Sequence, residues 1–85
     1  MRFYFRTIGG ELHLFRRKGL FGEDLGWLRP TLTGRLKTQK LWGTRYELRD
    51  ISGLFAKGER YAIRSSTGLS GILERTGLGD DYELR

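Results

Sequence analysis

Apolar and polar residues alternate along much of this chain, which is the pattern of β-strands that bury one face. Arg2–Ile8 alternates, Gly9-Gly10 follows, and Glu11–Arg16 alternates again. Two alternating runs joined by Gly-Gly predict a β-hairpin with a two-residue turn. Its facing pairs are then Ile8 with Glu11, Arg6 with His13, and Tyr4 with Phe15. Its core side carries the apolar residues Phe3, Phe5, Leu12 and Leu14.

A short motif, G-x-x-Y-x-[LI]-R, occurs three times in the second half of the chain, at residues 43–49, 58–64 and 79–85. A degenerate fourth copy spans residues 10–16. Each copy is a turn glycine followed by a strand with two large residues on one face and charge on the other. The copies therefore fit successive strands of one antiparallel meander or barrel.

Three other segments complete the predicted organisation. Residues 16–30 contain three glycines and one proline, which predicts a loop, and Thr31–Thr38 then alternates as a strand. Residues 66–76 favour one short helix capped by Ser66 and stopped by Gly77, although Leu69–Leu73 also fits a strand. We therefore expect an all-β or nearly all-β fold. It would be a small antiparallel barrel or strongly bent sheet of five to six strands, with at most one short helix near 66–76.

Length and charge bound the class of protein. The 85 residues are enough for one small domain, and there is no cysteine to form disulfides. The net charge is +6, and it is unevenly placed. Residues 1–49 carry eleven Lys or Arg against four Asp or Glu (+7), while residues 50–85 carry five against six (−1). The basic part of the chain favours a polyanion as partner, and a merely solubilising charge is the alternative.

The chemistry needed for catalysis is missing from the sequence. There is no cysteine nucleophile, no G-x-S-x-G motif and no phosphate-binding P-loop, and His13 is the only histidine. The acidic pairs Glu23-Asp24 and Asp80-Asp81 are adjacent, so within a strand they point to opposite faces. We expect a binding protein and not an enzyme, without cofactor or metal. No run of residues fits a membrane span or a signal peptide, so a cytoplasmic, nucleoid-associated or other intracellular location is expected.

Basic residues form two clusters on predicted strands. The outer face of the first hairpin carries Arg2, Tyr4 and Arg6 beside His13 and Phe15. Aromatic rings between arginines are typical of surfaces that stack single-stranded bases, and the alternative is that Tyr4 and Phe15 belong to a core. If residues 45–49 pair with residues 60–64, a second face carries Arg45, Arg49, Arg60 and Arg64 around Glu47. That face indicates an anion partner, or a solvated surface balanced by nearby acids.

A third basic cluster falls in predicted loops and at their borders. It consists of Arg16, Arg17 and Lys18, and of Arg35, Lys37 and Lys40 beside Trp42. Trp27 and Trp42 are better explained as partly buried anchors of a small core than as residues that read a ligand. The leading hypothesis is a small nucleic-acid-binding protein, with RNA or single-stranded DNA favoured and the phosphate backbone as the main contact. The alternatives are a protein-interaction or assembly domain that pairs through strand edges, including homo-oligomers, and a designed β-fold without function.

Overall fold

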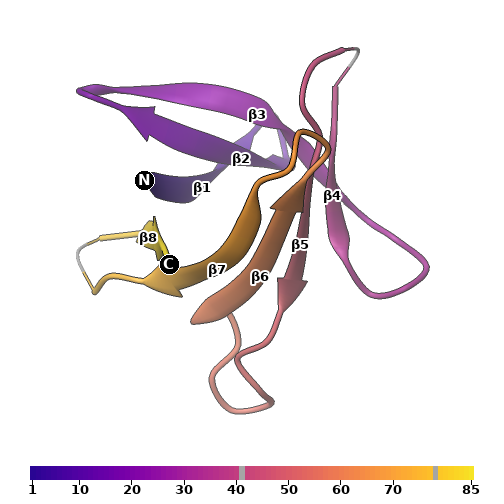
Figure 1. Cartoon of the computed structure of the whole chain (residues 1–85), viewed down its shortest axis with the longest axis vertical. Coiled ribbons are helices and arrows are strands. Elements are labelled where there is room, and N and C mark those ends of the chain that lie inside the picture. The colour runs from indigo at the N-terminus through magenta and orange to yellow at the C-terminus, as the bar shows by residue number, and fades with distance from the viewer. Residues whose placement is uncertain (41, 78) are drawn as a thin grey trace.

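The computed structural model describes residues 1–40, 42–77 and 79–85. Eight antiparallel strands lie within these residues; each pairs with its neighbours along the chain, and β8 pairs with β1, which closes the sheet into a barrel (Figure 1). The strands are β1 (Arg2–Ile8), β2 (Glu11–Lys18), β3 (Phe21–Pro30), β4 (Leu36–Gln39), β5 (Tyr46–Asp50), β6 (Arg60–Ser65), β7 (Ser70–Arg75) and β8 (Asp81–Leu84). The predicted all-β antiparallel barrel is confirmed, with eight strands where five to six were predicted.

The first hairpin and the repeated motif form strands as predicted. β1 and β2 pair with Ile8 opposite Glu11, Arg6 opposite His13 and Tyr4 opposite Phe15. The three full copies of the motif become β5, β6 and β8, each after its turn glycine. In β5 and β8 the tyrosine of the motif, Tyr46 or Tyr82, is buried. The regular alternation of apolar residues therefore predicts both the strands and the faces that they bury.

β3 lies in a segment that the sequence predicted as a loop. Its Gly26 has a φ of 116°, and the pairing of β3 with β2 shifts register between His13 and Phe15. A glycine at such an irregularity bends a strand and does not end it, because it adopts a backbone conformation that other residues avoid. The prediction of a loop over residues 16–30 was wrong for this reason.

Two further segments also differ from their predicted structure. Residues 66–76, favoured as a helix, contain β7, and a Cβ atom added to its Gly71 would lie 2.8 Å from the carbonyl oxygen of Arg85. Gly71 therefore lets the chain end approach β7 closely. The strand predicted over Thr31–Thr38 begins only at Leu36, because Thr31 N donates to Arg35 O (2.7 Å) and closes a turn.

Side chains from all eight strands fill the interior of the barrel, which leaves it a packed core. Phe3, Leu14, Leu48 and Leu73 have no exposed surface. Phe5, Tyr61 and Tyr82 form an aromatic cluster, with ring centroids 5.4 to 5.7 Å apart. The remaining buried members of the core are Leu25, Leu28, Tyr46 and Ile63.

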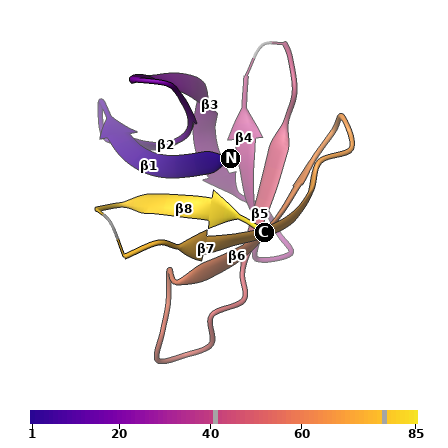
Figure 2. The same ribbon diagram turned by 60° about the vertical axis from the view of Figure 1, so that its left-hand side comes forward.

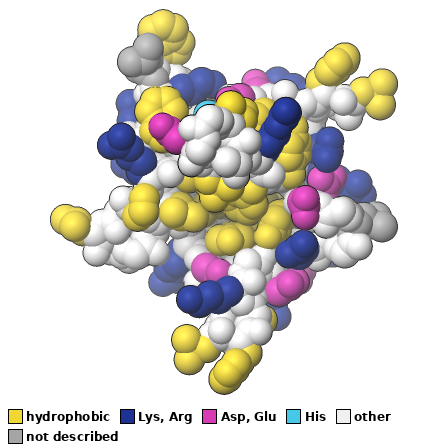
Figure 3. Space-filling view, turned by 180° about the vertical axis from the view of Figure 1, so that it is seen from behind, with side chains coloured by type: hydrophobic (Ala, Val, Ile, Leu, Met, Phe, Trp, Pro, Cys, Tyr) yellow, Lys and Arg dark blue, Asp and Glu magenta, His cyan; other side chains and the backbone are white. Residues whose placement is uncertain are grey.

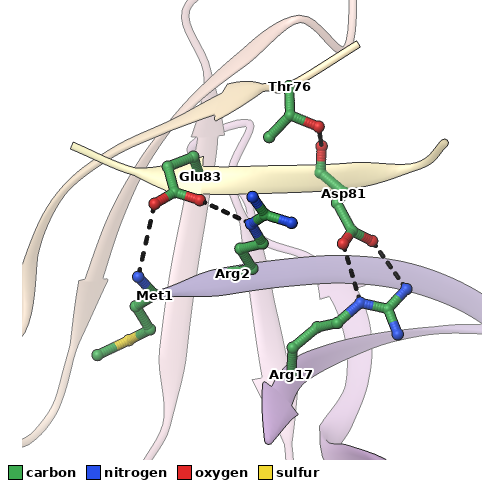
Figure 4. A network of polar contacts seen from close by, with 6 residues as sticks. All are labelled: Met1, Arg2, Arg17, Thr76, Asp81 and Glu83. Atoms are coloured by element: carbon green, nitrogen blue, oxygen red, sulfur yellow. Dashed lines mark hydrogen bonds and ion pairs between the residues drawn. The ribbon is translucent and has the colours of Figure 1, made fainter. Parts of the chain in front are cut away.

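The barrel closes where β8 lies beside β1, and polar contacts hold this seam (Figures 2 and 4). Only three residue pairs join the two strands in register. Arg17 of β2 reaches Asp81 with two hydrogen bonds of 2.9 Å, and Arg2 reaches Glu83 at 3.1 Å. The hydrogen bonds from Arg17 lower the pKa of Asp81 below its ordinary value, against the opposing effect of burial.

Replacing Asp81 by asparagine is expected to lower the free energy of unfolding at pH 7 by about 2 kcal/mol, because a charged, part-buried pair with Arg17 is lost. Since the pKa of Asp81 is lower in the folded than in the unfolded state, its carboxylate stabilises the fold above the unfolded pKa of about 3.9. That contribution is lost as the pH falls through the folded pKa. The variant should therefore lose less stability than the unaltered protein between about pH 5 and pH 3.

Urea denaturation at several pH values measures both effects. The matched control is Asp80→Asn, because the Asp80 side chain is 85% exposed and its nearest contact with Arg75 is 3.5 Å long. An exposed pair of this kind contributes about 0.5 kcal/mol or less. Equal losses in the two variants would contradict the assignment of Asp81 to the seam.

Candidate nucleic-acid interface

Basic side chains gather on the outer surface of β3, β4, β5 and β6. Leu48 and Ile63 face each other in the core, so their neighbours along β5 and β6 point outward. Across the strands, Arg29 lies opposite Lys37, Lys37 opposite Glu47, and Glu47 opposite Arg64. We call this surface the basic face; its charged members are Arg29, Arg35, Lys37, Arg45, Glu47, Arg49, Arg60 and Arg64. It carries seven cations and one carboxylate.

Glu47 lies at the centre of the basic face and holds two of its arginines. Its Oε1 accepts hydrogen bonds from Arg35 Nη1 (2.9 Å) and from Arg64 Nε and Nη2 (3.1 and 2.8 Å). These bonds, that of Arg35 first, hold the pKa of Glu47 below its ordinary value. Glu47 therefore stays ionised at neutral pH and fixes the orientation of two guanidinium groups.

The other cations of the basic face have no carboxylate partner within ion-pair distance among the residues that the structure describes. They are Arg29, Lys37, Arg45, Arg49 and Arg60. Like charges on neighbouring strands repel each other unless an anion lies between them. The face therefore presents a surplus of positive charge that a polyanion would neutralise.

Two shallow hollows flank the Glu47–Arg64 pair, each of about 200 Å³. One is lined by polar donors from Arg35, Arg49, Arg64 and Ser70, and the other by Lys37, Arg45, Ser65 and Ser66. Arg45 and Arg49 are four residues apart on β5, or about 13 Å along an extended strand. Guanidinium and hydroxyl donors at this separation suit successive anionic groups of an extended chain.

The basic residues of the first hairpin lie apart from this face and have structural partners. Arg2 pairs with Glu83, Arg17 with Asp81, and Arg16 and Lys18 both pair with Glu23. Arg6 is exposed on β1 and forms no ion pair with a described residue. The structure thus separates Arg2, Arg6, Arg16, Arg17 and Lys18 from the group formed by Arg35, Lys37, Arg45, Arg49, Arg60 and Arg64.

The aromatic pair expected to stack bases is occupied by contacts within the protein. Tyr4 stacks on Phe15 with ring centroids 5.0 Å apart, and the guanidinium carbon of Arg17 lies 4.4 Å from the Tyr4 centroid. Phe15 is only 7% exposed. Gly22 of β3 makes room for the Tyr4 hydroxyl, because a Cβ atom there would lie 1.9 Å from it. The alternative reading of Tyr4 and Phe15 as packed residues describes them better.

The two tryptophans differ from each other. Trp27 is half-buried on β3 opposite Gln39, as expected for an anchor, whereas Trp42 is 78% exposed between β4 and β5. The prediction that Trp42 is a buried anchor was therefore wrong. Lys40, on the same loop, donates from Nζ to the carbonyl oxygen of Asp24 (3.2 Å).

Arg29 is the member of the basic face that the sequence did not single out. It was placed in a loop, where alternation was not considered. The alternation of Trp27, Leu28 and Arg29, with only Leu28 buried, is the signal that would have found it.

Comparison of the chain with models of protein families, with curated proteins and with solved structures gave no match. Over residues 1–40, 42–77 and 79–85, the structure has no helix with the length and apolar character to cross a membrane. The same residues form no group of three or more His, Cys, Asp or Glu side chains that could hold a metal ion.

Proposed function

We propose that this protein binds nucleic acid, RNA or single-stranded DNA in preference to duplex, by contacting the phosphate backbone with the basic face. The observation that carries the proposal is the excess of seven cations over one carboxylate on four adjacent strands. Arginine suits this role because its planar guanidinium donates two parallel hydrogen bonds to a phosphate.

The shape of the face favours a polymer over a small anion. Its cations extend across four strands, and its two hollows are shallow and open along the surface. A small ligand is usually enclosed by its pocket, whereas a nucleic-acid strand follows an open charged groove. Binding of this kind depends on backbone charge, so it is weakly selective for sequence.

Association with a protein is the second candidate function. Pairing through strand edges has little support, because each strand of the closed barrel has two neighbours. Figure 3 shows hydrophobic side chains gathered at the middle of one face, while others stand apart at the loop tips. An apolar area of this kind can bind a partner. Association through it would not weaken with added salt, which distinguishes it from binding to phosphate.

A salt titration tests the proposal. Fluorescent single-stranded RNA and DNA oligonucleotides are expected to bind at about 50 mM salt. With about five phosphate contacts, the affinity should fall roughly a hundredfold between about 50 and 200 mM salt, because bound cations release counterions from the strand. The measurement is fluorescence anisotropy at each salt concentration. Absence of binding at low salt, or an affinity that salt does not change, would contradict the proposal.

A further inference from the structure

We infer that Trp42 stacks on an unpaired base and makes the basic face selective for single strands; this rests on the proposed function and specifies its ligand. Trp42 is 78% exposed and makes no aromatic contact or hydrogen bond with a described residue. Tryptophan offers the largest aromatic surface of any residue, and leaving it in water is unfavourable. A flat π-surface ligand would relieve that exposure.

The loop that carries Trp42 is held in place at both ends. Arg45 donates from Nη2 to the carbonyl oxygen of Lys40 (3.3 Å), which joins the two ends of the loop. Lys40 donates in turn to Asp24 O of β3 (3.2 Å). On the other side, the Arg45 backbone N–H donates to Ser66 Oγ (3.0 Å), and Ser66 N donates to Arg45 O (2.9 Å). The positions before and after Trp42 are therefore fixed to the barrel, which reduces the entropy lost on binding.

Trp42 is also close to the anion-binding groups of the face. It precedes Arg45 by three residues, so their Cα atoms are at most about 11 Å apart. Arg45 lines the hollow that Lys37, Ser65 and Ser66 complete. A base on Trp42 and the adjacent phosphates in this hollow would thus belong to one short stretch of a strand.

Stacking on Trp42 requires a base with a free face. In a duplex both faces of each base are covered by neighbouring base pairs, whereas the bases of a single strand can turn outward onto an aromatic side chain. The arginines contact phosphates of either form. The preference for single strands should therefore depend on Trp42, and the charge-dependent part of the affinity on the arginines.

The test compares Trp42→Ala with the unaltered protein, using one DNA sequence and its RNA counterpart, each as a single strand and as a duplex. Affinity for the single strands should fall roughly 5- to 100-fold, and affinity for the duplexes should change less than about twofold. Trp42→Phe should retain most of the single-strand affinity because it keeps a ring. In a Trp27→Phe background, Trp42 is the only tryptophan, and its fluorescence should be quenched by the single strand.

The matched control is Phe55→Ala, since Phe55 is as exposed as Trp42 but lies on the loop between β5 and β6, at the opposite end of the strands (Figure 1). It should leave both affinities unchanged. Equal loss on single strands and duplexes, or no loss, would overturn the role of Trp42. The proposed function would still stand if removal of the arginines abolished binding. Absence of binding to any of these nucleic acids would overturn both.

Discussion

Replacing Arg45, Arg49, Arg60 and Arg64 together by glutamine is expected to weaken binding of a single-stranded oligonucleotide several-hundred-fold at about 0.1 M salt. Each phosphate contact contributes about 0.7 to the slope of log affinity against log salt for a single strand, so four contacts remove about 2.8 from it. Three of these arginines have no carboxylate partner among the described residues, and Glu47 keeps Arg35 when Arg64 is lost. The fold should therefore remain intact.

A control with the same change of net charge separates a local interface from a general effect of charge. The matched variant replaces four cations that have carboxylate partners away from the basic face: Arg2, Lys18, Arg75 and Arg85. Both variants reduce the net charge from +6 to +2, since each removes four positive charges. The control should keep most of the affinity and most of the salt slope. Equal weakening by the two variants would show that the outer surface of β3–β6 is not the interface.

The sequence predicts the second half of this site well, because the motif determines it locally. In each copy of G-x-x-Y-x-[LI]-R, the apolar pair faces the core and the residues between and after it face outward. Arg45, Arg49, Arg60 and Arg64 were therefore placed on one face with Glu47 before the pairing of β5 with β6 was known, and the observed register agrees. Alternation also predicts the first hairpin and its turn.

The partners of the first basic cluster could not be predicted in the same way. Arg17 pairs with Asp81, which is 64 positions away in the sequence, and Arg2 pairs with Glu83. These contacts exist only because β8 returns to close the barrel on β1. Local patterns show which residues are outward and basic, but the acids that neutralise them are brought there by the order of eight strands.

Glycine within strands is the other source of error, and Gly26 shows why. Its φ of 116° and its place at the register shift of β3 make it part of a strand, although glycine in a sequence is typical of a turn. A Cβ atom on Gly26 would lie 2.5 Å from the carbonyl oxygen of Gln39 on β4. The glycine thus permits both the bend of β3 and its close approach to β4, neither of which a local pattern reveals.

Replacing Gly26 by alanine is therefore expected to lower the free energy of unfolding by about 3 kcal/mol or more, because backbone strain and a clash with a fixed carbonyl add together. The control is Gly68→Ala in the β6–β7 turn, where φ is a similar 102° but no atom lies within 4 Å of the added Cβ. It carries only the strain, about 1 to 2 kcal/mol. Urea denaturation compares the two.

The same substitution also tests how the barrel positions the interface. Relief of the clash at Gln39 requires β4 to move away from β3, which would separate Lys37 from Arg29 across the basic face. Gly26→Ala protein that remains folded should therefore bind the single strand more weakly than Gly68→Ala protein of equal folded fraction. If the two variants were equally stable and bound equally well, the close approach of β3 and β4 at Gly26 would have no role in the fold or in the site.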